Sequence, residues 1–112
     1  MWNFSIPYPL KHFIDVVTLP GENWKWSPTE GYQGLLTGKK ALLIYASAGN
    51  YGAEAPTPWE DFQKPYLRQW LRLLGITDTH EITVAPTLTD SESLAEITHA
   101  AATTATAVAS RF

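Results

Sequence analysis

One short stretch restricts the possible folds of this chain more than any other. Residues 41–45 (Ala-Leu-Leu-Ile-Tyr) form an uninterrupted apolar run, bounded by Gly38-Lys39-Lys40 before it and by Ser47-Ala48-Gly49 after it. A strand with one face in water alternates apolar and polar residues, whereas a strand inside a parallel sheet is apolar throughout because both of its faces are covered. The run therefore predicts a strand of a parallel sheet, covered on both faces.

Two amphipathic helices are predicted on either side of this strand in the sequence. The first covers residues 8–18, stops at Pro20-Gly21, and has an apolar stripe made of Leu10, Phe13, Ile14 and Val17. The second covers residues 59–74, with Gly75 directly after its end. Its stripe consists of Phe62, Tyr66, Trp70 and Leu73 and is extended by Leu67, Leu71 and Leu74. A helix that is apolar over so much of its circumference is expected to be largely buried.

A second strand and a third helix complete the predicted elements. Residues 81–85 match a strand. Thr89-Asp90-Ser91-Glu92 matches a capping box that opens a helix reaching about Ser110. Its inner face is expected to contain Leu94, Ile97, Ala101 and Val108. Segments 21–38 and 46–58 are expected to be irregular, except for a short extended piece at Trp24-Lys25-Trp26.

The order helix, strand, helix, strand, helix indicates an α/β fold, which we expect to form a single domain over residues 1–112. Two strands alone do not make a stable parallel sheet, because each needs neighbours and cover. The predicted sheet is therefore incomplete.

Composition and charge exclude several classes of function. The net charge of −3 and the lack of a basic cluster argue against nucleic-acid binding, which requires grouped Lys and Arg. The chain has no cysteine, which excludes disulfides and thiolate chemistry. His12, His80 and His99 lack metal-ligand spacing. No stretch has the length of a membrane span and the N-terminus does not match a signal peptide, so we expect a soluble cytoplasmic protein with no membrane partner.

Three segments, in order, carry a resemblance to a known family. Residues 1–15 contain the pattern Asn-Phe-Ser-x-Pro, then Leu-Lys, then Ile-Asp. Residues 34–41 (Gly-Leu-Leu-Thr-Gly-Lys-Lys-Ala) lead into the central strand, and Tyr66-Leu67 with Leu74-Gly75-Ile76-Thr77 match a helix end and turn. Together they resemble the FMN-dependent NADH-azoreductase and NAD(P)H:quinone oxidoreductase family. The resemblance implies a flavodoxin-like fold, a three-layer parallel sheet, of which this chain resembles only the C-terminal half. The chain therefore looks truncated, without the phosphate-binding loop that the family's first half supplies.

The resemblance also implies site residues, a cofactor and partners. It implies that FMN is bound between an N-terminal loop and the loop after the central strand, and that the cofactor-binding residues are Met1, Trp2, Asn3, Phe4, Ala46, Ser47, Ala48, Gly49 and Asn50. The family usually has Arg-Gly-Gly where this chain has Ser47-Ala48-Gly49. On the substrate side it implies Tyr51, Trp24 and Trp26. NAD(P)H would reduce the flavin, which would then reduce a quinone or azo compound in a homodimer, so no catalytic side chain is implied.

Several alternatives stay open at this level. From the residue pattern alone, core packing is favoured for Trp2 and Phe4, whereas the resemblance favours contact with the flavin ring. For Trp24 and Trp26, a substrate-side lid and a simple loop cluster are equally favoured. For the chain as a whole, the alternatives to an FMN reductase module are a non-catalytic half-fold acting as an assembly or interaction module, and half of a site that a separate polypeptide completes.

Overall fold

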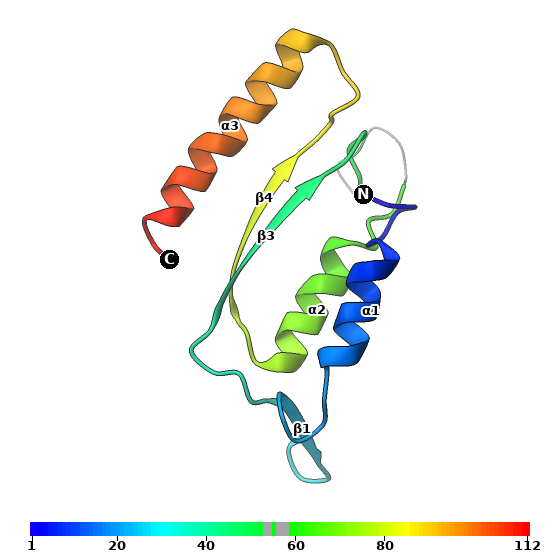
Figure 1. Cartoon of the computed structure of the whole chain (residues 1–112), viewed down its shortest axis with the longest axis vertical. Helices are drawn as coiled ribbons and strands as arrows, with labels where there is room; N and C mark the ends of the chain where they lie inside the picture. The colour runs from blue at the N-terminus through cyan, green and yellow to red at the C-terminus, as the bar shows by residue number, and fades with distance from the viewer. Residues whose placement is uncertain (53–54, 56–58) are drawn as a thin grey trace. The chain divides into compact units, whose positions relative to one another are not determined.

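The computed structural model describes residues 1–52, 55 and 59–112, so parts of the predicted 46–58 loop, residues 53–54 and 56–58, lie outside the described residues. The chain order is α1 (Tyr8–Val17), β1 (Trp24–Ser27), β2 (Gly31–Gly34), β3 (Lys40–Ala46), α2 (Lys64–Leu74), β4 (Asp78–Val84) and α3 (Ser91–Ala109) (Figure 1). The chain forms two compact units. We call Trp2–Ala41 with Asp61–Asp78 the helical unit, and Met1 with Leu42–Glu60 and Thr79–Phe112 the strand unit.

The β1–β2 hairpin corrects the prediction that residues 21–38 are irregular. The extended piece at Trp24 and Trp26 is confirmed as β1, and β2 pairs with it antiparallel, with Trp26 opposite Tyr32. The loop between the strands closes through the amide of Glu30, which donates to Ser27 Oγ at 3.1 Å, and through Gly31 at a φ of 69°. β2 reads Gly-Tyr-Gln-Gly, and its two glycines hide the usual pattern of a strand.

Helix α1 begins and ends close to its predicted limits. Pro9 in its first turn suits a helix N-terminus, because the N–H that proline lacks would have no partner there. At its end, both the amide and the hydroxyl of Thr18 donate to the carbonyl of Ile14. The predicted apolar stripe is narrower than expected: Ile14 is buried, but Phe13 is 55% exposed. The periodicity identified the helix correctly but not the width of its buried face.

Helix α2 starts at Lys64, five residues later than predicted. The carboxylate of Asp61 accepts the amides of Gln63 and Lys64 at 2.8 and 3.0 Å, so the backbone before the helix is held in a turn. Phe62 therefore lies before the helix, where it is exposed, and its assignment to the apolar stripe is wrong. The leucines of the stripe, Leu67, Leu71 and Leu74, are buried as expected.

The end of α2 confirms the predicted role of Gly75. Its φ of 91° is left-handed, and two hydrogen bonds close a Schellman motif: Gly75 N–H to the carbonyl of Arg72 at 3.0 Å and Ile76 N–H to the carbonyl of Leu71 at 2.9 Å. This end also contacts the hairpin. A Cβ added to Gly34 would lie 2.0 Å from the backbone nitrogen of Gly75, and Leu36 N–H donates to the carbonyl of Leu74 at 2.9 Å. Only two glycines permit so close a backbone approach.

Strands β3 and β4 are neighbours in one sheet and run parallel in Figure 1. The predicted cover on both faces of β3 is wrong for this chain. Its residues alternate in burial: Tyr45 is buried, whereas Leu42 is 37% exposed and Ile44 is 66% exposed. Successive side chains of a strand point to opposite faces, so the described residues cover only one face of this strand.

Helix α3 confirms the predicted inner face, since Val108 is buried and Leu94, Ile97 and Ala101 are partly buried. The N-cap is Asp90 rather than Thr89, because the Asp90 carboxylate accepts the amides of Glu92 and Ser93 at 3.0 and 2.9 Å. Beyond the helix, the Phe112 ring lies 5.7 Å from that of His80 on β4. In the described part of the chain, no helix combines the length and apolar character needed to span a membrane.

Candidate functional site

The N-terminal segment folds into a tight turn in the helical unit. Trp2 N–H donates to the carbonyl of Ser5 at 3.1 Å, and Ser5 N–H donates to the carbonyl of Trp2 at 2.9 Å. The two central residues, Asn3 and Phe4, have φ angles of 44° and 66°. Positive φ at both central positions is the pattern of a type I′ turn, which asparagine tolerates and phenylalanine disfavours. Such strain persists only where surrounding contacts impose it, and it is concentrated at functional sites.

Two hydrogen bonds hold this strained turn in place. Phe62 N–H donates to the carbonyl of Phe4 at 3.0 Å, and the side-chain amide of the buried Gln63 donates to the carbonyl of Ser5 at 3.2 Å. The aromatic side chains of the turn remain accessible: Trp2 is 64% exposed and Phe4 is 41% exposed. Core packing therefore does not account for these two rings. The turn is a fixed support for exposed aromatic side chains.

A cavity of about 620 Å³ lies beside this turn, lined by Trp2, Asn3 and Ser5 together with residues of α1 and Tyr66 of α2. On its α1 side, Lys11 Nζ donates to both carboxylate oxygens of Asp15 at 2.6 Å. This hydrogen bonding to Asp15 raises the pKa of Lys11 above its ordinary value. The rim of this cavity is therefore polar, with its charges paired.

The loop after β3, in the strand unit, is fixed by backbone pairing. Ser47 N–H donates to the carbonyl of Val84 at 3.2 Å, and the carbonyl of Ser47 accepts both the amide and the hydroxyl of Thr87 at 2.9 and 3.1 Å. Leu88 N–H donates to the carbonyl of Ala48 at 3.1 Å. The pairing of β3 and β4 thus continues into the loops. Sequence reasoning missed Thr87, since nothing local links it to Ser47.

The predicted cofactor residues of this loop have different environments. Ser47 is buried, and its hydroxyl donates to the carbonyl of Gly49 at 2.8 Å. Ala46, Ala48 and Asn50 are exposed, and the half-buried ring of Tyr51 lies against Gly49. This loop therefore offers backbone groups and the Asn50 amide at its surface.

Met1 joins the loop after β3, because its amino group donates to the carbonyl of Ala46, at the carboxyl end of β3. Both residues belong to the strand unit. In open α/β sheets, ligands bind outside the carboxyl ends of the strands. The first predicted cofactor residue thus lies at the end of the sheet where a ligand is expected.

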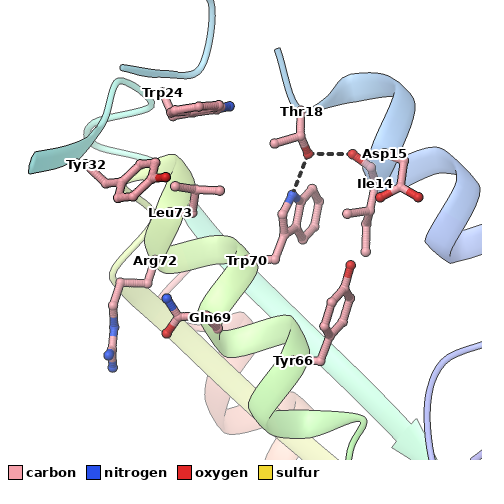
Figure 2. Close-up of a pocket in the computed structure, with 10 residues that line it drawn as sticks. All are labelled: Ile14, Asp15, Thr18, Trp24, Tyr32, Tyr66, Gln69, Trp70, Arg72 and Leu73. Atoms are coloured by element: carbon pink, nitrogen blue, oxygen red, sulfur yellow. Dashed lines mark hydrogen bonds between the residues drawn. The ribbon is translucent and has the colours of Figure 1, made fainter. Parts of the chain in front are cut away.

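The predicted substrate residues Trp24 and Trp26 lie in different environments. Trp24 lines a cavity of about 700 Å³ between α1, α2 and the hairpin, which we call the indole pocket (Figure 2). Its main lining residues are Ile14, Thr18, Trp24, Tyr32, Trp70 and Leu73. Trp26 is exposed and does not line it. Tyr32, which sequence reasoning missed with β2, has its ring centroid 5.5 Å from that of Trp24, tilted by 46°.

The chain is similar in sequence to known proteins. An FMN-dependent NADH:quinone oxidoreductase from Desulfotalea psychrophila is 53% identical over 94 residues, which are 83% of this chain and 43% of the relative. One from Nitratidesulfovibrio vulgaris strain DP4 is 42% identical over 102 residues, 91% of this chain and 48% of the relative. The chain thus spans less than half the length of these two relatives.

Solved structures also match this chain, again over about half of their own length. The crystal structure of an azoreductase from Bacillus anthracis strain Sterne matches with a TM-score of 0.87 at 29% identity, over 99% of this chain and 52% of the other. An FMN-dependent NADH-azoreductase from Bacillus anthracis strain Ames Ancestor, in complex with FMN, matches with a TM-score of 0.74 at 29% identity, over 91% of this chain and 51% of the other.

These matches confirm the resemblance that the three sequence segments indicated, the α/β architecture with a parallel sheet, and the partial coverage of the fold. The family model described as "Flavodoxin-like fold" matches residues 1–108, nearly the whole chain. The chain belongs to the flavodoxin-like fold family.

Proposed function

We propose that this chain is a module of an FMN-dependent NAD(P)H oxidoreductase that acts on quinone or azo acceptors as a homodimer. The observation that carries the proposal is the turn at Asn3-Phe4, a strained backbone held by hydrogen bonds that displays two exposed aromatic side chains. The relatives support it, since their names specify FMN, NADH and quinone or azo compounds.

The residues on the N-terminal turn suit an isoalloxazine ring. Trp2 and Phe4 offer apolar aromatic surface, and the Asn3 side chain offers both a donor and an acceptor for the polar edge of the flavin. Because the turn is held by Phe62 and Gln63, these groups are positioned before a ligand arrives, which lowers the entropic cost of binding.

The loop after β3 would contribute main-chain groups. Residues 46–50 are held against residues 84–88, and Met1 lies against Ala46. The Ser47 hydroxyl is buried and bound to the carbonyl of Gly49, so it does not replace the charge of the family's arginine. Bound FMN would supply the hydride chemistry between NADH and the acceptor, while the chain would orient the ring and limit its access to water. We expect weak FMN binding, because the residues proposed to contact FMN include neither an arginine nor a phosphate-binding loop.

The test is an FMN titration of the pure chain, followed by flavin absorbance and fluorescence. We expect saturable binding with a Kd in the micromolar range or weaker, about −8 kcal/mol or less favourable. Phe4→Ala should weaken binding about tenfold because it removes an aromatic wall. Phe13→Ala is the matched control, since Phe13 is also an exposed phenylalanine but lies on α1 away from the proposed contacts, and it should change binding less than about twofold. Equal effects of the two variants, or no saturable binding, would contradict the proposal.

One observation favours a second function, that of a non-catalytic assembly module. The exposed face of β3 presents Leu42 and Ile44, and β3 has one strand neighbour, β4, among the described residues. Exposed apolar faces and strand edges favour association with other chains. Sedimentation and flavin absorbance together distinguish the two functions. Association of chains without a flavin absorption band supports the assembly module, whereas association with FMN binding supports the reductase. A purely monomeric 12.5 kDa species would contradict both.

A further inference from the structure

We propose that two copies of this chain associate by pairing their β3 strands antiparallel, edge to edge, about a two-fold axis at Leu43. The inference rests on the second function proposed above, the assembly module, and names its partner as another copy of the same chain. It involves the strand unit alone and does not depend on FMN binding.

One edge of β3, which we call the outer edge, faces away from β4. Ser47 N–H donates to the carbonyl of Val84, so the main chain of residue 47 faces β4. Main-chain groups alternate between the two edges of a strand, so those of residues 42, 44 and 46 face the outer edge. In agreement, the carbonyl of Ala46 accepts the amino group of Met1 instead of pairing with β4. In the described part of the chain, β4 is the only strand paired with β3.

The outer edge has little protection against pairing with a further strand. Proteins block exposed strand edges with proline or with charged side chains along the strand. Residues 41–46 contain neither. The one charged residue of β3, Lys40, lies at its start, with its ammonium group 3.8 Å from the carboxylate of Asp78. The edge is therefore suited to strand addition.

The sequence of β3 is complementary to itself in one antiparallel register. With Leu43 opposite Leu43 of the second copy, Leu42 lies opposite Ile44 of the second copy, and the symmetry gives a second such pair. Both pairs are of the hydrogen-bonded kind, because the main chains of residues 42 and 44 face the outer edge. The side chains of Leu42 and Ile44 are 37% and 66% exposed on one face of the strand, so four aliphatic side chains would meet there.

Charge and main-chain pairing favour this register over its neighbours. The two Lys40 residues would lie about 20 Å apart along the strands, so like charges do not oppose each other. A shift of two residues in one direction would place Lys40 opposite Ile44. A shift in the other direction would require the carbonyl of Ala46, which already accepts Met1.

The contact is small, so the association should be weak. Specific, stable interfaces bury about 1,200–2,000 Å² in total, and two strand edges with four aliphatic side chains bury less than that. We expect a dissociation constant of about 10–1,000 µM.

The first test is amide hydrogen exchange of the unmodified chain, measured by NMR at protein concentrations below and above this range, together with sedimentation. Exchange of the Leu42 and Ile44 amides should slow several-fold as the chains associate. The Leu43 amide faces β4 and is the internal control, with equal protection at both concentrations. Association without slower exchange at Leu42 and Ile44 would overturn the inference and leave the assembly function standing. A chain that stays monomeric would overturn both.

The second test is cross-linking, for which the chain offers a clean background because it has no cysteine. Leu43→Cys should form a disulfide-linked dimer on oxidation, because a non-hydrogen-bonded pair at the two-fold axis brings its Cα atoms to about 4.5 Å. Ala41→Cys is the control on the same strand face, since its two copies would be about 14 Å apart, beyond the reach of a disulfide. Equal cross-linking of the two variants would overturn the antiparallel register. If Leu43→Cys does not fold, the exchange measurement on the unmodified chain decides.

A charge on the exposed face should break the association. Ile44→Lys places two ammonium groups in the aliphatic cluster and should raise the dissociation constant at least about tenfold. Leu88→Lys is the matched control, because Leu88 is 83% exposed in the same unit but lies outside the paired segment, and it should leave the association unchanged. Equal effects of the two variants would contradict pairing through β3.

Discussion

The helical unit and the strand unit hold their backbones together by different means. In the helical unit, the hairpin and the end of α2 touch main chain to main chain at Gly34 and Gly75, with no room for a side chain. In the strand unit, the backbone is joined by strand pairing that continues past Ser47, while Leu42 and Ile44 remain exposed on one face of β3. The difference shows where substitutions should affect stability. In the helical unit, the contact between Gly34 and Gly75 excludes larger residues. In the strand unit, substitutions on the exposed face of β3 should have little effect on stability.

The largest effect should come from Gly34→Ala. The new Cβ would lie 2.0 Å from the nitrogen of Gly75, so the backbone of the hairpin or of α2 must move. We expect a loss of more than about 3 kcal/mol in the free energy of unfolding, above the usual cost of overpacking, because the new atom would meet backbone rather than a side chain that can move. The measurement is urea unfolding followed by circular dichroism.

Gly31→Ala is the control for this change, because Gly31 is at the other end of β2 and has nothing within 4 Å of an added Cβ, although its φ of 69° is left-handed. It should cost only the strain of a left-handed alanine, about 1–2 kcal/mol. If the two variants lose equal stability, the close contact at Gly34 has no energetic importance, and the contrast between the units fails.

A smaller effect separates buried leucines from exposed ones. Leu71 of α2 is buried, so Leu71→Ala should lower the free energy of unfolding by about 2–5 kcal/mol. Leu42→Ala, on the exposed face of β3, should cost less than about 1 kcal/mol. Paired denaturation curves measure both losses. A loss at Leu42 as large as that at Leu71 would mean that the exposed face is covered in solution, as the assembly module requires.

The smallest effect concerns the N-terminus of α3 and is specific to the strand unit. Hydrogen bonds from the amide and hydroxyl of Ser93 hold the pKa of Asp90 below its ordinary value of 3.8. A lowered folded-state pKa means that this contribution to stability is present above about pH 4 and is lost as the pH falls through the folded-state value. Helicity should therefore decline on acidification in part through this residue.

Asp90→Asn provides the comparison, because the amide oxygen still caps α3 but does not titrate in this range. Helicity measured by circular dichroism between pH 5 and pH 2 should fall less steeply in this variant than in the unmodified chain. Identical pH profiles would show that the Asp90 carboxylate contributes nothing beyond the other acidic groups.

Much of the fold could be predicted from local patterns. The apolar run 41–45, the spacing of Leu67 and Leu71, and the glycine at position 75 each specify an element through short-range rules, and the structure has each of them. The position of Gly75 was correct because a left-handed helix end requires only its own residue and the preceding turn. Strand β2 was missed because the glycines that its contacts require also weaken the pattern of a strand.

The candidate site was predicted less completely, because its contacts join distant segments. The resemblance indicated Asn3 and Phe4, but their left-handed conformation is imposed in part by Phe62 and Gln63, far along the chain. The hydrogen bond from Thr87 to the carbonyl of Ser47 likewise joins segments that are far apart in the sequence. Hydrophobic periodicity in the sequence does not indicate such long-range contacts.

The sequence by itself determined the family, the order of the three helices and of β3 and β4, and the ends of α1 and α3, because these depend on spacing and capping within a few residues. Only the tertiary structure decided that Gly34 must have no side chain, that Phe13 and Ile44 are exposed, and that Trp24 Nε1 is buried without an acceptor within the described chain. The physical reason is that burial, close contact and hydrogen-bond satisfaction belong to pairs of atoms. Folding brings those atoms together from positions that are remote in the sequence.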